Sequence, residues 1–529
     1  MFYDNSKSGG GKNSGPKEEI TAQQAAMTIL LVAGAAAANH AAQIENFYIR
    51  NFQMIWMGAW VIVLGFIFLA LRWFVNKNRD AEKYGITFEH LVPKGQTGRI
   101  YVGHTEGTGL SLSRKQRLGH VQILGTTGRG KTESLILPWI VRDANTGSSS
   151  LLIDGKGDPE LAYRVQDALN GKAKVQVFDL GNPEKSFVMN PLKFGSAQAI
   201  TDRIFASFDF PDPFYKGVQY DLALAIVSAI KSTGEVVCFQ KLHSCLVNDA
   251  ELAKLGKDCS DVKLKTRIQK MLASPRATRE QNQMGLVSQL APFAEGEVAH
   301  LVNGIAKGDK TEKLIEFENL LLQKSGEQRL PMVCIVLLPT LKFQIAAKQL
   351  GRMLLQELAG LIGERASREG KRAEFFSVYL DEFSAFAYQG FEQILNKARS
   401  SRVALHLSHQ SMADLSMVSP DFARVVNTNT NVKCLLGLND PDTADFYARH
   451  IGTRGSERRT ERIEDRGWMA GSSRTGQASV REVEEYKIHP NELKNFTNGV
   501  GVLHLPTPDG NFTARVQFAR LYPKECVSE

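Results

Sequence analysis

The chain has 529 residues, of which 43% are hydrophobic and 23% charged, and its formal net charge is +8. This length predicts two or three domains, and the composition excludes a chain dominated by low-complexity sequence. The positive charge favours polyanionic partners such as nucleic acid or anionic lipid. It is weak support, because positively charged loops beside membrane helices give the same balance.

Two N-terminal segments resemble membrane helices. Residues 54–71 (MIWMGAWVIVLGFIFLAL) carry no charge, and the apolar run continues after Arg72, so we expect a transmembrane helix over 54–75. A buried soluble helix is the poorer alternative, because such helices rarely stay apolar on every face. The weaker, Ala-rich segment 22–42 is interpreted as an uncleaved membrane helix rather than a signal peptide.

The orientation follows from the basic residues around these segments. Arg72, Lys77, Arg79 and Lys83 follow the second segment, and lysines also precede the first. Positive charge stays on the cytoplasmic side, so only a short loop near residues 43–53 would face outward. We therefore expect residues 1–76 to form a multi-pass anchor in a bacterial inner membrane, with the bulk of the chain cytoplasmic.

A nucleotide-binding motif follows a short predicted strand at 120–124. It matches G-x-x-x-x-G-K-[ST] at every fixed position and is followed by a predicted helix at 133–141, which is the context the motif requires. Glycines let backbone N–H groups surround phosphates, and the helix N-terminus favours the anion. Lys131 would reach the β- and γ-phosphates of ATP, and the Thr132 hydroxyl would ligate Mg²⁺. The predicted cofactor-binding residues are Gly125, Thr126, Thr127, Gly128, Arg129, Gly130, Lys131 and Thr132.

A P-loop needs acidic groups from a distant strand. A predicted strand at 374–380 ends in Asp381-Glu382. Asp381 would hold Mg²⁺ through water, and Glu382 would act as general base toward the attacking water. Another predicted strand, at 404–407, leads to Gln410, which is either a γ-phosphate sensor or an ordinary polar residue at a strand end.

The remaining pattern predicts the fold class. Further strands are expected at 149–153, 332–338 and 435–438, with a long helix at 343–364. Strands alternate with helices, so we expect an α/β fold with a parallel, doubly wound sheet.

In these motifs the sequence resembles the TraD/TraG-like type IV coupling proteins, relatives of the FtsK and HerA ATPases. The similar segments are Asp154-Gly155-Lys156-Gly157-Asp158, Asn190-Pro191-Leu192, Asp212-Pro213-Phe214-Tyr215, Asp381-Glu382 and Gln410-Ser411. The resemblance covers roughly residues 50–520. It implies an inner-membrane, ATP-driven protein that delivers DNA, as a relaxase–single-stranded DNA complex, to a type IV secretion channel during conjugation.

The resemblance also implies a domain order and an assembly. The order is an anchor (1–76), a RecA-like P-loop NTPase domain in two parts (77–215 and 330–529) and an inserted all-α domain (216–329). Arg399, with Arg402 as its rival, would be an arginine finger acting across subunits of a homo-hexamer, and Gln410 would be the sensor. The implied cofactors are ATP and Mg²⁺. The implied partners are DNA, the relaxosome and the inner-membrane complex of the secretion system.

The sequence departs from the family in two respects. The predicted outward loop is very short where many members carry a small periplasmic domain. The chain also ends soon after the last predicted strand (511–521), without the acidic tail that some members use for docking.

Two basic stretches are candidate DNA contacts. Residues 216–329 are mostly helical in pattern, with helices expected at 220–232, 249–255, 262–272, 280–293 and 311–323. Lys263, Lys265, Arg267 and Lys270 would contact phosphates, although a solvated helix face explains them equally well. The arginine-rich stretch 454–477 is predicted to be a mobile loop that lines a pore or a subunit interface, or a surface excursion.

Several alternatives stay open at this point. The rival functions are a coupling ATPase for protein effectors, an FtsK/HerA-like DNA translocase and a channel-assembly ATPase. The six sparse cysteines are typical of reduced thiols, and Cys238, His243 and Cys245 are only a weak suggestion of a metal site, because a fourth ligand is missing.

Overall fold

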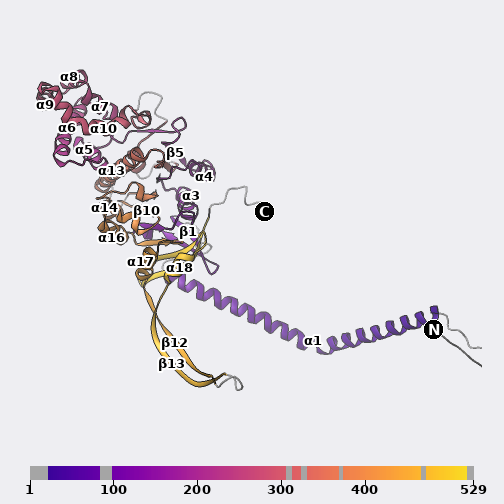
Figure 1. Cartoon of the computed structure of the whole chain (residues 1–529). Coiled ribbons are helices and arrows are strands. Elements are labelled where there is room, and N and C mark those ends of the chain that lie inside the picture. The colour runs from indigo at the N-terminus through magenta and orange to yellow at the C-terminus, as the bar shows by residue number, and fades with distance from the viewer. Residues whose placement is uncertain are drawn as a thin grey trace, which may run out of the picture. The chain divides into compact units, whose positions relative to one another are not determined.

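The computed structural model describes residues 22–83, 98–305, 313–322, 330–368, 373–465 and 472–520. The chain divides into two compact units, Met1–Arg79 and Asp80–Glu529. Figure 1 shows the order of the helices and strands along the chain.

The N-terminal unit is built on one long helix, α1 (Ala22–Lys83). The predicted loop at residues 43–53 is wrong, because these residues continue the helix and contain neither proline nor glycine to interrupt it. Both predicted membrane segments, 22–42 and 54–75, thus belong to the same helix. Among the residues described, no helix has the combined length and hydropathy needed to span a bilayer, so the two predicted membrane helices are not confirmed.

The second unit is organised around an 11-stranded sheet with the order β2-β1-β15-β14-β11-β3-β10-β9-β4-β8-β5. The strands from β11 to β5 all pair in parallel. The bounds of the strands are β1 (Arg99–Thr105), β2 (Thr108–Ser113), β3 (Val121–Leu124), β4 (Ser150–Asp154), β5 (Lys174–Asp179), β8 (Met332–Leu337), β9 (Phe376–Asp381), β10 (Val403–His409), β11 (Val432–Leu435), β14 (Val500–Thr507) and β15 (Gly510–Phe518).

The α/β class is confirmed, and the predicted parallel pairing holds from β11 to β5 but not at one edge of the sheet. Strands β14, β15, β1 and β2 pair antiparallel with their neighbours. For β14 and β15 the reason is local: Pro508 and Asp509 connect the two strands directly, and a connection this short permits only a hairpin.

Helices cover both faces of the sheet. Along β4, Leu151 and Ile153 face one apolar cluster while Leu152 faces the other, as the twofold period of a strand requires. The helices around the sheet are α2 (Arg114–Arg117), α3 (Leu137–Asn145), α4 (Pro159–Leu169), α13 (Gln344–Arg368), α14 (Glu392–Ala398), α15 (Met412–Ser416), α16 (Pro420–Asn429), α17 (Pro441–Ile451) and α18 (Pro490–Asn495).

A group of helices interrupts the alternation of strands and helices, and it begins at residue 197, before the predicted range 216–329 (Figure 1). They are α5 (Ala197–Ser207), α6 (Pro213–Ser232), α7 (Phe239–Val247), α8 (Asp249–Asp258), α9 (Val262–Ala273), α10 (Arg276–Ala294) and α11 (Ala299–Val302). The predicted helix at 311–323 lies partly outside the described residues, and in the described part only residues 317–321 are α-helical. There β7 (Leu314–Ile315) pairs with β6 (Val188–Met189) before the short helix α12 (Phe317–Leu321).

The arginine-rich stretch 454–477 is not a loop where the structure describes it. It belongs to a two-stranded antiparallel ribbon of β12 (Thr453–Asp465) and β13 (Ser472–Tyr486), visible in Figure 1. Thr, Ile and Val are interspersed among the charged residues of this stretch, and such β-branched residues favour strands.

Candidate nucleotide site

The P-loop leaves the carboxyl end of β3, whose residues are all buried. Gly128 and Gly130 adopt positive φ angles of 79° and 86°, which glycine accepts without a steric penalty. The chain then enters a π-helical turn (Thr132–Ile136) that continues into α3. The Lys131 Nζ atom curls back and donates a hydrogen bond of 2.6 Å to the Gly125 carbonyl oxygen.

The two acidic residues at the end of β9 meet the P-loop. The Asp381 carboxylate accepts hydrogen bonds of 2.6 Å from the Thr132 hydroxyl and 2.6 Å from the Ser408 hydroxyl. The Glu382 Oε1 atom lies 4.0 Å from Lys131 Nζ. Residues 249 positions apart in sequence therefore share one site.

Gln410 completes this cluster from the end of β10. Its side-chain amide donates a hydrogen bond of 3.3 Å to Glu382 Oε2, and its backbone N–H donates one of 3.0 Å to Asp414 Oδ2. Lys131, Thr132, Asp381, Glu382 and Gln410 are thus brought together, as expected when parallel strands end at one edge of a sheet.

The cluster borders an open pocket. Its lining residues are Thr126, Thr127, Gly128, Gly130, Lys131, Thr132, Glu133, Asp154, Lys156, Asp158, Glu160, Leu161, Arg164, Asp381 and Glu382. The donor set fits a magnesium nucleotide, because hydroxyl and carboxylate oxygens suit Mg²⁺ and the lysine and backbone N–H groups suit phosphate.

One P-loop side chain points elsewhere. Arg129 does not line the pocket; its Nη1 atom donates to the Phe496 carbonyl oxygen at 2.8 Å. The position of its side chain fits an anchor between the P-loop and α18.

Asp154 is a site residue to which the sequence analysis assigned no role. It ends β4 directly beside Asp381, and its two carboxylate oxygens accept backbone hydrogen bonds of 2.9 Å from Lys156 and 2.9 Å from Asp158. Burial and the neighbouring Asp381 raise the pKa of Asp154 to about 7. In the sequence, the position of Asp154 at the end of an apolar strand and before Gly155-Lys156-Gly157 could have indicated this role.

The candidate arginine fingers lie away from the pocket of their own chain. Arg399 follows α14 and lines a separate hollow with Lys115 and Asn431, near the amino end of β10. Arg402 immediately precedes β10, and its carbonyl oxygen accepts a hydrogen bond of 3.0 Å from the Phe376 N–H. Both arginines therefore lie at the amino end of β10, whereas Gln410 lies at its carboxyl end.

The candidate DNA contacts lie on α9. Lys263 and Lys270 are exposed, Lys265 is half-buried, and none of the three makes an ion pair within the described ranges. Arg267 forms an ion pair with Asp221. Among its basic neighbours, Arg276 pairs with Glu280 at 2.7 Å and Arg279 with Asp249 at 2.8 Å. The lysines are thus the freer cations of this group.

The metal alternative at Cys238, His243 and Cys245 has no support in the structure. All three residues are buried, and His243 Nδ1 lies 3.2 Å from Glu295 Oε1. The described part of the chain contains no group of three His, Cys, Asp or Glu side chains able to hold a metal ion.

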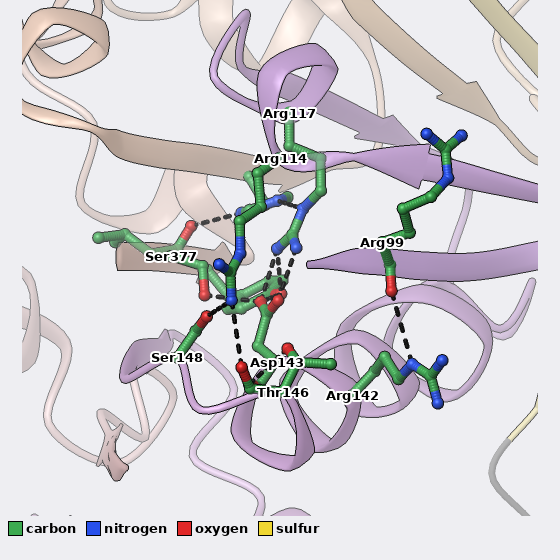
Figure 2. Close-up of polar contacts among 11 residues, drawn as sticks. Arg99, Arg114, Arg117, Arg142, Asp143, Thr146, Ser148 and Ser377 are labelled. Carbon is green, nitrogen blue, oxygen red and sulfur yellow. Dashed lines mark hydrogen bonds and ion pairs between the residues drawn. The ribbon is translucent and has the colours of Figure 1, made fainter. Parts of the chain in front are cut away.

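A buried polar cluster links α2, α3, β9 and β10 (Figure 2). Arg117 forms two hydrogen bonds of 2.6 Å with the Asp143 carboxylate of α3, and its Nε atom lies 3.1 Å from His406 Nε2 of β10. The hydroxyls of Ser377 and Tyr379 on β9 each donate to Asp143 at 2.7 Å. The helix after the P-loop is thereby tied to the strands that carry Asp381 and Gln410.

The chain is similar to known proteins in sequence and in fold. Residues 376–498, from β9 past α18, match the family model described as the TraM recognition site of TraD and TraG. A curated relative, the type 4 coupling protein DotL of Legionella pneumophila subsp. pneumophila (strain Philadelphia 1), is 22% identical over 426 residues. The chain resembles the type IV coupling proteins. The match covers 68% of this chain and 53% of DotL, so the chain spans about half the length of that relative.

Solved coupling-protein structures share the fold. The conjugative coupling protein TrwBdeltaN70 in its unbound monoclinic form gives a TM-score of 0.56 at 13% identity, covering 80% of this chain and 90% of that one. TrwB in complex with ADP and Mg²⁺ gives 0.55 at 12% identity, with coverage of 82% and 93%. The family resemblance expected from the motifs is confirmed, and so is a P-loop NTPase fold with helical additions.

Proposed function

We propose that this chain is an ATP-driven type IV coupling protein that recruits DNA, as a relaxase–single-stranded DNA complex, and translocates it to a secretion channel during conjugation. The convergence of Lys131, Thr132, Asp381 and Glu382 on one pocket carries this proposal. Such a constellation serves nucleotide hydrolysis, since it pairs a phosphate cradle with a Mg²⁺ ligand and a base.

Each side chain has a defined task in this reaction. A bound Mg–ATP supplies the phosphoryl group and the cation that neutralises its charge. Lys131 would leave the Gly125 carbonyl for the β- and γ-phosphates, while Thr132 and Asp381 hold the cation. Glu382 orients and deprotonates the attacking water, and Gln410, hydrogen-bonded to Glu382, contacts the γ-phosphate. The solved TrwB complex with ADP and Mg²⁺ supports this choice of cofactors.

The working form would be a homo-hexamer. Arg399 lies at the sheet edge opposite the pocket of its own chain, so it can reach a nucleotide only in a neighbouring subunit. There it would stabilise the charge that develops on the transferred phosphoryl group.

DNA and the relaxosome would bind to different parts of the chain. We infer that residues 77–215 and 330–529 form the motor, and that the helices within residues 216–329 form an inserted domain at the substrate entrance. Lys263, Lys265 and Lys270 would contact DNA phosphates there, and the segment 376–498 would engage the relaxosome.

The matching location is a bacterial inner membrane, beside the inner-membrane complex of the secretion system. Exposed apolar side chains along α1, including Trp60, Phe66 and Phe68, support membrane association of this segment. Carbonate extraction of cell membranes tests it: recovery of the chain in the soluble fraction would contradict this location.

The deciding experiment measures ATP hydrolysis by the full chain, with and without single- and double-stranded DNA, over a salt series. A DNA motor should be stimulated by DNA, and the stimulation should fade as salt rises, because phosphate contacts release counterions. Lys131→Ala is the control that removes hydrolysis. Hydrolysis that is lost in Lys131→Ala but indifferent to DNA would support protein cargo instead.

A further inference from the structure

A buried lysine lies beside the site without a part in the proposed chemistry. Lys433 on β11 is 1% exposed, and its Nζ atom donates to Gln122 Oε1 at 2.8 Å, to the Asn427 carbonyl oxygen at 2.6 Å and to Thr430 Oγ1 at 2.7 Å. Burial lowers the pKa of Lys433. The oxygens of Gln122 and Asn427 can only accept, so Lys433 Nζ must donate to both of them.

This arrangement is costly, because a buried amine without a carboxylate partner either gives up its proton or holds a poorly compensated charge. No carboxylate is among the hydrogen-bond partners of Lys433. A methionine of similar length would fill the space without that cost. A buried amine that is linked through Gln122 and His409 to the reactive site points to a functional role.

The hydrogen bonds from Lys433 have a fixed direction. Because Gln122 Oε1 accepts from Lys433, the Gln122 amide nitrogen must face His409 Nε2, 2.9 Å away. His409 Nε2 then accepts a hydrogen bond, so its proton sits on Nδ1 and is donated to the Ser411 carbonyl oxygen at 2.8 Å.

The neutral state of His409 agrees with this direction. Burial lowers the pKa of His409 to about 4, and the nearby charges of Lys131 and Lys433 act in the same sense. The hydrogen bond to Ser411 and the charge of Asp414 oppose the shift without reversing it. His409 thus keeps one acceptor and one donor nitrogen near neutral pH.

The chain of hydrogen bonds ends around Gln410. The His409 ring bridges to the Ser411 carbonyl on one side, and Asp414 Oδ2 accepts from the N–H groups of Gln410 and Ser411, both at 3.0 Å, on the other. The backbone of Gln410 is therefore held from both sides, and its side chain reaches Glu382.

We propose that Lys433 is a positioning residue that holds Gln410 for hydrolysis through Gln122 and His409. The inference rests on the proposed function, since it assigns Gln410 to the hydrolytic step. It connects β11 and α16, which lie inside the segment matching the TraM recognition model, to the nucleotide pocket.

The test removes, one at a time, the hydrogen bonds between Lys433, Gln122 and His409 in the full-length protein. Lys433→Met and Gln122→Met keep the buried volume, and each should lower kcat roughly tenfold, because a misplaced group loses part of its catalytic effect. ADP affinity, measured by calorimetry, should stay unchanged in both variants. The double variant should lose no more than either single one, and neither change should matter in a Gln410→Ala background.

Lys172→Met, which removes an exposed lysine between α4 and β5, is the matched control. An unchanged kcat in both folded variants would overturn the inference. So would an equal loss in the Gln410→Ala background, or a parallel loss of ADP affinity, which indicates a merely structural role. Hydrolysis that survives Lys131→Ala would instead contradict the proposed function itself.

Discussion

Glu382 illustrates how a single residue is adapted to the site. Its backbone is left-handed, with a φ angle of 49°, a conformation that non-glycine residues rarely adopt. Such strain is concentrated at functional sites, where the surrounding structure enforces it. Here the turn places the carboxylate between Lys131 and Gln410.

Glu382→Gln should separate nucleotide binding from hydrolysis. The amide keeps the shape of the side chain but cannot accept a proton, so kcat should fall by about 10²–10⁴-fold. ADP affinity and phosphate release are the two measurements. Glu184→Gln, an exposed substitution, is the control, and a normal rate in Glu382→Gln would remove Glu382 as the base.

The buried carboxyl group of Glu357 should make the stability of the folded protein depend on pH. Burial raises its pKa from 4.5 to about 7, while nearby Arg203 opposes the shift. Between these two pH values the folded state binds a proton that the unfolded state has released, so stability falls as pH rises through this window. Glu357→Gln stays neutral, and its Tm relative to the natural chain should therefore increase from about pH 4.5 to about pH 7. A difference in Tm that is flat across this range would contradict the assignment.

At the scale of elements, the site depends on strands that end together. Asp154 and Asp381 are register partners on β4 and β9, and β10 runs parallel to β3 and β9, so its end lies beside them. The sequence predicted the strands that bear these residues because apolar runs and the polar residues after them are local signals. It did not predict which strands are neighbours.

The buried cluster of Arg117 and Asp143 should be essential to this arrangement. Asp143→Ala leaves a charged guanidinium buried without its partner, which typically costs about 3–5 kcal/mol. Thermal unfolding should show a large decrease in Tm. Asp421→Ala, which breaks the exposed pair with Arg424, is the matched control and should change Tm little. Equal effects of the two substitutions would contradict a structural role for the cluster.

At the scale of the whole molecule, hydrolysis should depend on assembly. Arg399 lies at the opposite edge of the sheet from the pocket, so a contribution to catalysis requires a second subunit.

Arg399→Ala should therefore lower kcat by about 10³-fold or more in the assembled protein, and have little effect on dilute monomer. The measurement is hydrolysis rate against protein concentration, with the oligomeric state followed by light scattering. Arg402→Ala is the comparison, because it was the rival candidate. The same fractional loss in monomer would exclude action across an interface.

The sequence by itself determined the P-loop, the acidic pair Asp381-Glu382 and a helical interruption after residue 215, because each depends on a few consecutive residues and their backbone preferences. Only the tertiary structure decided the antiparallel edge of the sheet, the ribbon of β12 and β13, and the continuity of α1. It also decided the partners of buried polar groups: Arg117 and His406 are 289 positions apart, and Lys433 and Gln122 are 311 apart. A buried charge must find its partners wherever the fold brings them, and no local pattern encodes that pairing.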